Sequence, residues 1–169
     1  MAFLINPGGE NDKDSIALAT RRGNRIPNWK KVERAPDAMQ AALSMVTGGH
    51  EGRVLRSLAS TYNCIGMAFA NRRTCIEPEQ VPSILQEDGF VEVAQAAGVV
   101  AGDVVVYELD GEISHVAVVI SNTPDLADGS SKISVLSQWG FDGEYLHDYR
   151  DVHPSLGSPV RFYSERRTI

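Results

Sequence analysis

Apolar residues recur at helical spacing in the first half of the chain, after an opening stretch without any period. Residues 38–46 predict one helix, which ends at Gly48–Gly49. A second helix is predicted to begin at Cys64, and a third to occupy residues 82–88. The segment 50–61 between the first two is ambiguous between a short helix and a turn. The apolar positions that define the three helices are Met39, Leu43, Val46, Ile65, Ala68, Phe69, Ile84 and Leu85.

After Gly98 the pattern changes to that of β-strands. Two apolar runs, Val104–Leu109 and Ile113–Ile120, flank Asp110–Gly111, a pair typical of two-residue hairpin turns. Shorter runs predict three more strands, at Ile133–Trp139, Glu144–His147 and Pro159–Tyr163. The helices precede the strands, so the predicted class is α+β, with N-terminal helices packed on a C-terminal antiparallel sheet of about five strands.

Chain length and composition predict a single domain with an N-terminal arm. The chain has 169 residues, of which 43% are hydrophobic, which is enough for one core and too little for two. Residues 1–36 are rich in Gly, Asn, Pro and charged residues, and we interpret them as an arm that is partly disordered or draped over the domain. Residues 37–169 form the domain itself, and the arm is a candidate segment for a protein partner.

Charge and hydropathy exclude two classes of partner. The net charge is −6 and the basic residues occur at most in pairs, so we expect no nucleic-acid partner. The sequence contains no run of roughly 20 apolar residues, so we expect no membrane partner. The N-terminus lacks both the basic region and the long apolar region of a secretory signal, and we therefore expect a cytoplasmic protein.

Two cysteines, Cys64 and Cys75, are the only ones in the chain. If one helix ran through both, their separation would be about 16 Å, which is too far for a disulfide. The sequence has no CxxC pair, and Cys64 with His115 would supply only two ligands where zinc usually takes four. We therefore predict neither a disulfide nor a metal site, and no cofactor.

Cys64 is the strongest candidate for a nucleophile because it stands at the predicted start of a helix. Unpaired backbone N–H groups and the helix dipole favour a thiolate over a thiol at that position. Asn63 can cap the same helix, and an N–H group near it could form half of an oxyanion hole. The alternative is a small buried cysteine with a structural role.

His115 lies within a predicted buried strand, 51 residues after Cys64. A cysteine at a helix start followed by a histidine on a central strand is the order used by papain-like folds, where the imidazole takes the thiol proton. A third polar group orients the imidazole, and Ser137 and Gln138 on the next strand are the candidates. Only one of them can face His115 because strand side chains alternate. His147 is either a further member of this group or a solvated or structural histidine, and His115 itself could be a core histidine bonded to backbone.

Three segments, YNCIGMAFA, GDVVVYELDGEISHVAVVI and VLSQWGFDGEYLHD, resemble papain-like domains that include CHAP amidases and NlpC-type cell-wall peptidases. Closer still is the resemblance to bacterial relatives with an S-[KQ]-[LW]-G stretch and a later histidine. The similarity covers about residues 62 to 163. It implies a Cys64–His115 dyad, with Ser137 or Gln138 as the polar residue after the histidine strand. The Glu and Asn that CHAP domains carry near this strand are absent here, so cell-wall specificity is not implied.

These observations lead to one leading hypothesis and two alternatives. The leading one is a cysteine-dependent hydrolase that acts on a peptide or amide bond through an acyl-enzyme. The same dyad could perform deamidation or acyl transfer, which differ in the carbonyl that enters and in the group that attacks the acyl-enzyme. The third is a non-catalytic papain-like module that binds a partner through the same groove.

Overall fold

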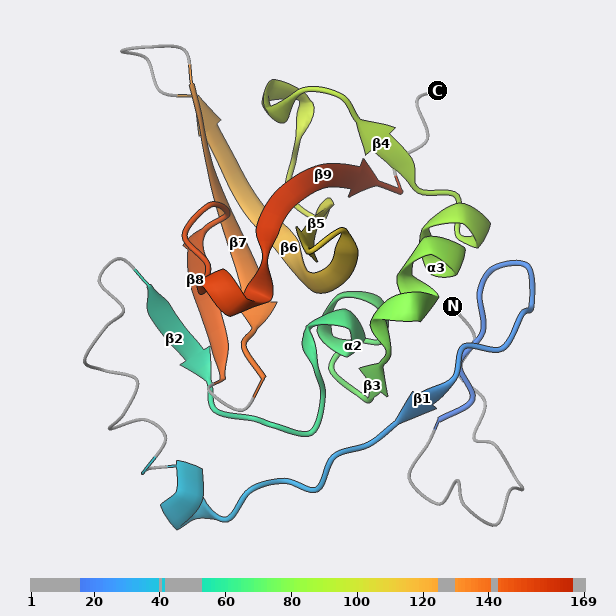
Figure 1. Cartoon of the computed structure of the whole chain (residues 1–169), viewed down its shortest axis with the longest axis vertical. Helices are drawn as coiled ribbons and strands as arrows, with labels where there is room; N and C mark the ends of the chain where they lie inside the picture. The colour runs from blue at the N-terminus through green and yellow to red at the C-terminus, as the bar shows by residue number, and fades with distance from the viewer. Residues whose placement is uncertain (1–15, 40, 42–52, 125–129, 141–142, 166–169) are drawn as a thin grey trace.

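The computed structural model describes residues 16–39, 41, 53–124, 130–140 and 143–165, and its main element is a seven-stranded antiparallel sheet (Figure 1). The strand order is β2-β8-β7-β6-β5-β9-β4. The α+β class predicted from the sequence is confirmed, whereas the prediction of about five strands is too low. The strands of this sheet are β2 (Val54–Ser57), β4 (Val91–Val93), β5 (Val104–Leu109), β6 (Glu112–Pro124), β7 (Ser131–Gln138), β8 (Glu144–Asp148) and β9 (Ser158–Ser164).

The central hairpin of the sheet is formed by β5 and β6. Asp110 and Gly111 both have positive φ angles, 54° and 85°, as a type I′ turn requires. Strand β6 continues four residues beyond the predicted end at Ile120, and this polar extension pairs with β7. Cross-strand pairing therefore extends a strand where the apolar pattern has already stopped.

The two edge strands, β2 and β4, are absent from the sequence prediction. The expectation of a short helix or turn over residues 50–61 is wrong for residues 54–57, which pair with β8. Strand β4 has three residues and pairs with β9. Strands this short show too little alternation to be recognised, and pairing with longer neighbours stabilises them.

The helices are short. They are α2 (Cys64–Phe69) and α3 (Val81–Glu87), with 3₁₀ turns η1 (Pro78–Gln80), η2 (Ala96–Gly98) and η3 (Pro154–Leu156). Helix α2 ends where Asn71 and Arg72 adopt positive φ angles, 50° and 62°. Cys75 therefore does not continue this helix but lies in β3 (Cys75–Ile76), which pairs with β1 (Asn28–Trp29). Both cysteines are free.

Two hydrophobic clusters cover the two faces of the sheet. On the helix-covered face, Val104, Val106 and Val116 pack with α2 and α3. The N-terminal segment adds Leu18 and Ile26 to this cluster, so part of the predicted arm belongs to the core. On the opposite face lie the alternate residues of the same strands and their neighbours: Val105, Tyr107, Ala117, Val119, Ile133, Val135 and Tyr149.

Of the first predicted helix, residues 38, 39 and 41 are helical, and residues 40 and 42–46 lie outside the described residues. In the part of the chain that is described, the helices are too short and too polar to cross a membrane.

Candidate functional site

Cys64 is the first residue of α2, and Asn63 caps that helix. Asn63 Oδ1 accepts hydrogen bonds from the N–H groups of Gly66 (2.9 Å) and Ile76 (3.1 Å), while its Nδ2 donates to the Ile76 carbonyl (2.7 Å). The predicted cap is therefore confirmed, and the same side chain fastens α2 to β3. Gly66 is required at this contact, because a Cβ there would lie 1.6 Å from the Thr74 carbonyl oxygen.

The Cys64 thiol is buried, with 8% of the residue exposed. Burial raises the pKa of the thiol to about 11, although the backbone N–H groups of Val116, Ile65 and Cys64 itself act in the opposite direction. The thiol is therefore protonated at neutral pH. The helix start does not produce the activated thiolate expected from the sequence, because α2 has only six residues and desolvation outweighs the N–H groups.

The His115 side chain lies on one face of the sheet, and Cys64 packs on the other. It pairs directly with Tyr107 across the β5–β6 ladder, and the two ring centroids are 5.2 Å apart. Tyr107 belongs to the cluster on the opposite face, while the next residue, Val116, belongs to the helix-covered face with Cys64. The structure thus brings Cys64 beside the residue that follows His115, and no hydrogen bond joins the thiol to the imidazole.

The His115 ring is enclosed and unbonded. Only 1% of the residue is exposed, and neither ring nitrogen has a hydrogen-bond partner in the described structure. Burial lowers the pKa of His115 to about 3, with a smaller contribution from His147. The ring is therefore neutral at pH 7, and the interpretation of His115 as a core histidine bonded to backbone is not borne out.

Ser137 and His147 form a buried hydrogen-bonded chain on the same face as His115. Trp139 Nε1 donates to Ser137 Oγ (2.8 Å), and His147 Nδ1 lies 2.8 Å from the Asp148 carbonyl, which can only accept. His147 Nε2 is thus the acceptor in its 2.8 Å contact with Ser137 Oγ, and the hydroxyl donates to it. Ser137 orients His147 rather than His115. His147 is 2% exposed, which makes it a structural histidine and not a solvated one.

Gln138 is the last residue of β7, at the end of the strand near α2. Its Nε2 donates to the carbonyls of Ala59 (2.9 Å) and Gly140 (3.0 Å), and its Oε1 has no partner in the described structure. Strand alternation places Ser137 on the face of His115 and Gln138 on the other face. Ser137 therefore shares the face of His115 and Gln138 does not, but neither side chain hydrogen-bonds to His115, so neither holds the orienting role in the described structure.

A half-buried ion pair next to the Cys64 helix, between an exposed Arg72 and a buried Glu144, is absent from the sequence prediction. Arg72 Nε and Nη2 bind Glu144 Oε2 and Oε1 at 2.7 and 3.0 Å, and the Tyr62 hydroxyl donates to Glu144 Oε2 (3.1 Å). The hydrogen bonds that Arg72 donates to Glu144 raise the pKa of Arg72, while burial raises the pKa of Tyr62. This group ties both ends of α2 to β8. Glu144 is 82 positions from Tyr62 and 72 from Arg72, so no local pattern reveals the group.

The described residues contain no group of three or more His, Cys, Asp or Glu side chains that could hold a metal ion. Trp139 is a core residue packed on Tyr145, with ring centroids 5.1 Å apart. No protein-family description, no curated protein and no solved structure matches this chain.

Proposed function

We propose that the chain is a papain-like domain and a cysteine-dependent hydrolase, in which Cys64 attacks the carbonyl of a peptide or amide and His115 takes the thiol proton. One observation carries the proposal: the Cys64 sulfur accepts a hydrogen bond from the backbone N–H of Val116, the residue that follows His115, and His115 is a buried histidine whose two ring nitrogens have no partner in the described structure. The order of the elements, a capped helix bearing the cysteine and then a central strand bearing the histidine, supports it.

The unbonded imidazole supports a functional role for His115. Leaving a buried polar group without a partner costs about 1–3 kcal/mol, so a histidine kept only for packing would be replaced at a gain in stability. Rotation of the side chain alone keeps the imidazole on the face of Tyr107, because the Cβ of a strand residue points to one face of the sheet. The proposal therefore requires a local shift of β6 that brings the imidazole to Sγ, and a ring that makes no hydrogen bond loses none in that movement.

In the proposed reaction, each proton that leaves one group is accepted by another. His115 accepts the Cys64 proton while Sγ attacks the carbonyl carbon, and the imidazolium then protonates the leaving amine as the thioester forms. Water next gives a proton to His115 and attacks the thioester, which releases the carboxylic acid, and the proton returns to the thiolate. The backbone N–H groups of Val116, Ile65 and Cys64, which act on the thiol, are the candidate donors for the developing oxyanion.

A second candidate, the non-catalytic binding module, is favoured by a separate observation. Cys64 and His115 start from opposite faces of the sheet, and each is held in its uncharged form by burial. In a module of this kind the two groups are packing residues, and partners bind to the surface alone.

Acyl transfer from p-nitrophenyl acetate separates the two candidates. We expect the hydrolase to carry an acetyl group on Cys64, located by peptide mass spectrometry, and to release it with time. The Cys75→Ala variant should behave as the wild type, whereas His115→Ala should lose most of the acetylation. An unmodified Cys64 in folded protein would contradict the hydrolase and leave the binding module.

A further inference from the structure

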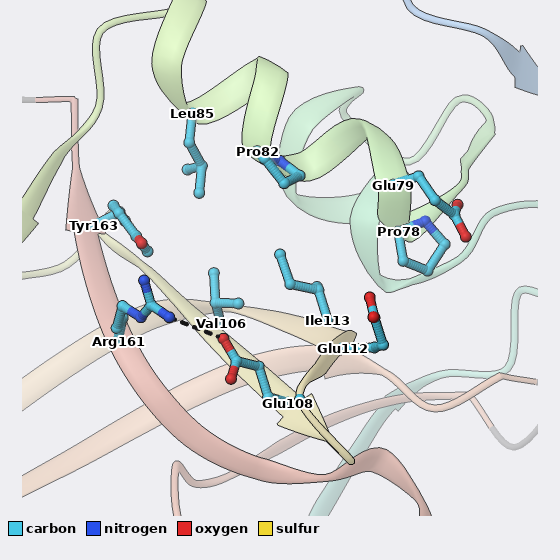
Figure 2. A pocket seen from close by; sticks show the side chains of 11 residues that line it. Pro78, Glu79, Pro82, Leu85, Val106, Glu108, Glu112, Ile113, Arg161 and Tyr163 are labelled. Carbon is cyan, nitrogen blue, oxygen red and sulfur yellow. Dashed lines mark hydrogen bonds and ion pairs between the residues drawn. The ribbon is translucent and has the colours of Figure 1, made fainter.

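A cavity of about 510 Å³ lies between α3 and the β5, β6 and β9 strands, on the helix-covered face of the sheet (Figure 2). Its floor is apolar and consists of Leu85, Val106 and Ile113, with Pro82 on the wall toward α3. Leu85 and Val106 also belong to the hydrophobic core, so the floor is fixed by the fold. The volume, and a lining that combines apolar side chains with a few charged ones, are those of a site for a small organic ligand.

The two ends of the cavity differ in charge. At one end Arg161 and Tyr163 lie on β9, and Arg161 Nη2 is 3.2 Å from Glu108 Oε1, so that end is internally neutralised (Figure 2). At the other end stand Glu79 of η1 and Glu112 of β6 (Figure 2). In the described structure these two carboxylates have neither a hydrogen bond nor an ion pair. The cavity therefore offers negative charge that no group of the described chain compensates.

We infer that this cavity binds an aliphatic cation, a primary ammonium group on an unbranched hydrocarbon chain. The hydrocarbon lies on Leu85, Val106 and Ile113, and the ammonium group lies between Glu79 and Glu112. An anionic ligand fits less well, because it would have to separate Arg161 from Glu108 while facing the two free carboxylates. This inference does not rest on the proposed hydrolase function.

The experiment is a titration with n-hexylamine at pH 7, followed by NMR of the methyl groups of Val106, Leu85 and Ile113. We expect saturable shifts of these methyl signals, which n-hexanol and hexanoate produce only weakly. Affinity for hexylamine should fall by about fivefold in Glu112→Gln or Glu79→Gln. Addition of salt should also weaken binding, because Glu79 and Glu112, which pair with the ammonium group, are exposed to solvent.

Asp37→Asn is the matched control, since it removes one exposed carboxylate outside the cavity. It should leave the affinity unchanged. Three results would overturn the inference: no saturable shift of the floor methyl groups, binding of hexanoate as strong as that of hexylamine, or equal affinity in the Glu79→Gln, Glu112→Gln and wild-type proteins. All three variants change exposed side chains, so their folding can be verified by the unchanged spectrum of the core.

Discussion

The helix-covered face of the sheet is apolar around Cys64, whereas the opposite face carries a chain of buried polar groups. On the first, the thiol packs among valines and the residues of α2. On the second, Trp139, Ser137 and His147 are linked by hydrogen bonds, and the Tyr107 hydroxyl donates to the Tyr149 carbonyl (2.8 Å). Each polar group of this chain has a partner, and His115 beside it has none.

This difference shows how one strand serves two environments. His115 and Val116 are neighbours in sequence, yet the alternation of β6 directs one toward Tyr107 and the other toward α2. A cysteine and a histidine in the right order along the chain are therefore not sufficient for a dyad. The face that each strand residue takes decides whether they meet, and in this structure their meeting requires a shift of β6 that brings His115 to the face of Cys64.

The largest expected effect tests the helix-covered face. Gly66→Ala places a Cβ against the Thr74 carbonyl, a backbone atom that cannot move aside. We expect a loss of about 3 kcal/mol or more in the free energy of unfolding, or failure to fold. Chemical denaturation measures it. The control is Gly98→Ala, whose Cβ meets only a flexible Val93 methyl at 3.3 Å, and a similar loss in both variants would show that the α2–β3 contact is not the cause.

The next effect tests the opposite face through pH. Burial lowers the pKa of His115 to about 3 and also lowers the pKa of His147, so below pH 6.5 the unfolded chain binds protons that the folded chain does not. Stability should therefore fall as the pH drops from 6.5 toward 3, by up to about 1.4 kcal/mol per pH unit for His115, and His147 contributes in the same direction.

Urea denaturation between pH 7 and pH 4 measures this dependence. His115→Gln should reduce the slope, and His153→Gln, a change of an exposed residue, should not. A slope that is the same in His115→Gln and in the wild type would mean that His115 is not held neutral by the fold.

A smaller effect is expected from the polar chain itself. Ser137→Ala removes the hydroxyl that binds both Trp139 and His147 and leaves two buried groups unsatisfied, at a cost of roughly 2 kcal/mol. Ser134→Ala on the same strand is the control, since its side chain has no hydrogen bond in the described structure. Equal stability of the two variants in a thermal or chemical melt would contradict the hydrogen bonds from Trp139 to Ser137 and from Ser137 to His147.

Some elements follow directly from local sequence. Asp110–Gly111 predicts the central hairpin because a type I′ turn needs positive φ at both residues, and Asn63 predicts the cap of α2 because its side chain can reach back to an N–H group. Strand β2 and the Arg72–Glu144 pair do not follow, since both depend on β8, which is distant in the sequence. The placement of His115 relative to Cys64 depends on which face each strand residue takes. Because β6 carries apolar residues on both faces, its sequence shows no alternation from which the face of His115 could be predicted.

The most direct test of the central claim is the rate of iodoacetamide labelling at Cys64, resolved from Cys75 by peptide mass spectrometry, from pH 5 to pH 9 in the wild type and in His115→Ala. If the His115 ring reaches the thiol, labelling of the wild type should already proceed below pH 8, and the His115→Ala substitution should abolish this low-pH reaction. Labelling that is slow, rises only at alkaline pH and is the same in both proteins would contradict the hydrolase and identify Cys64 as a buried structural thiol.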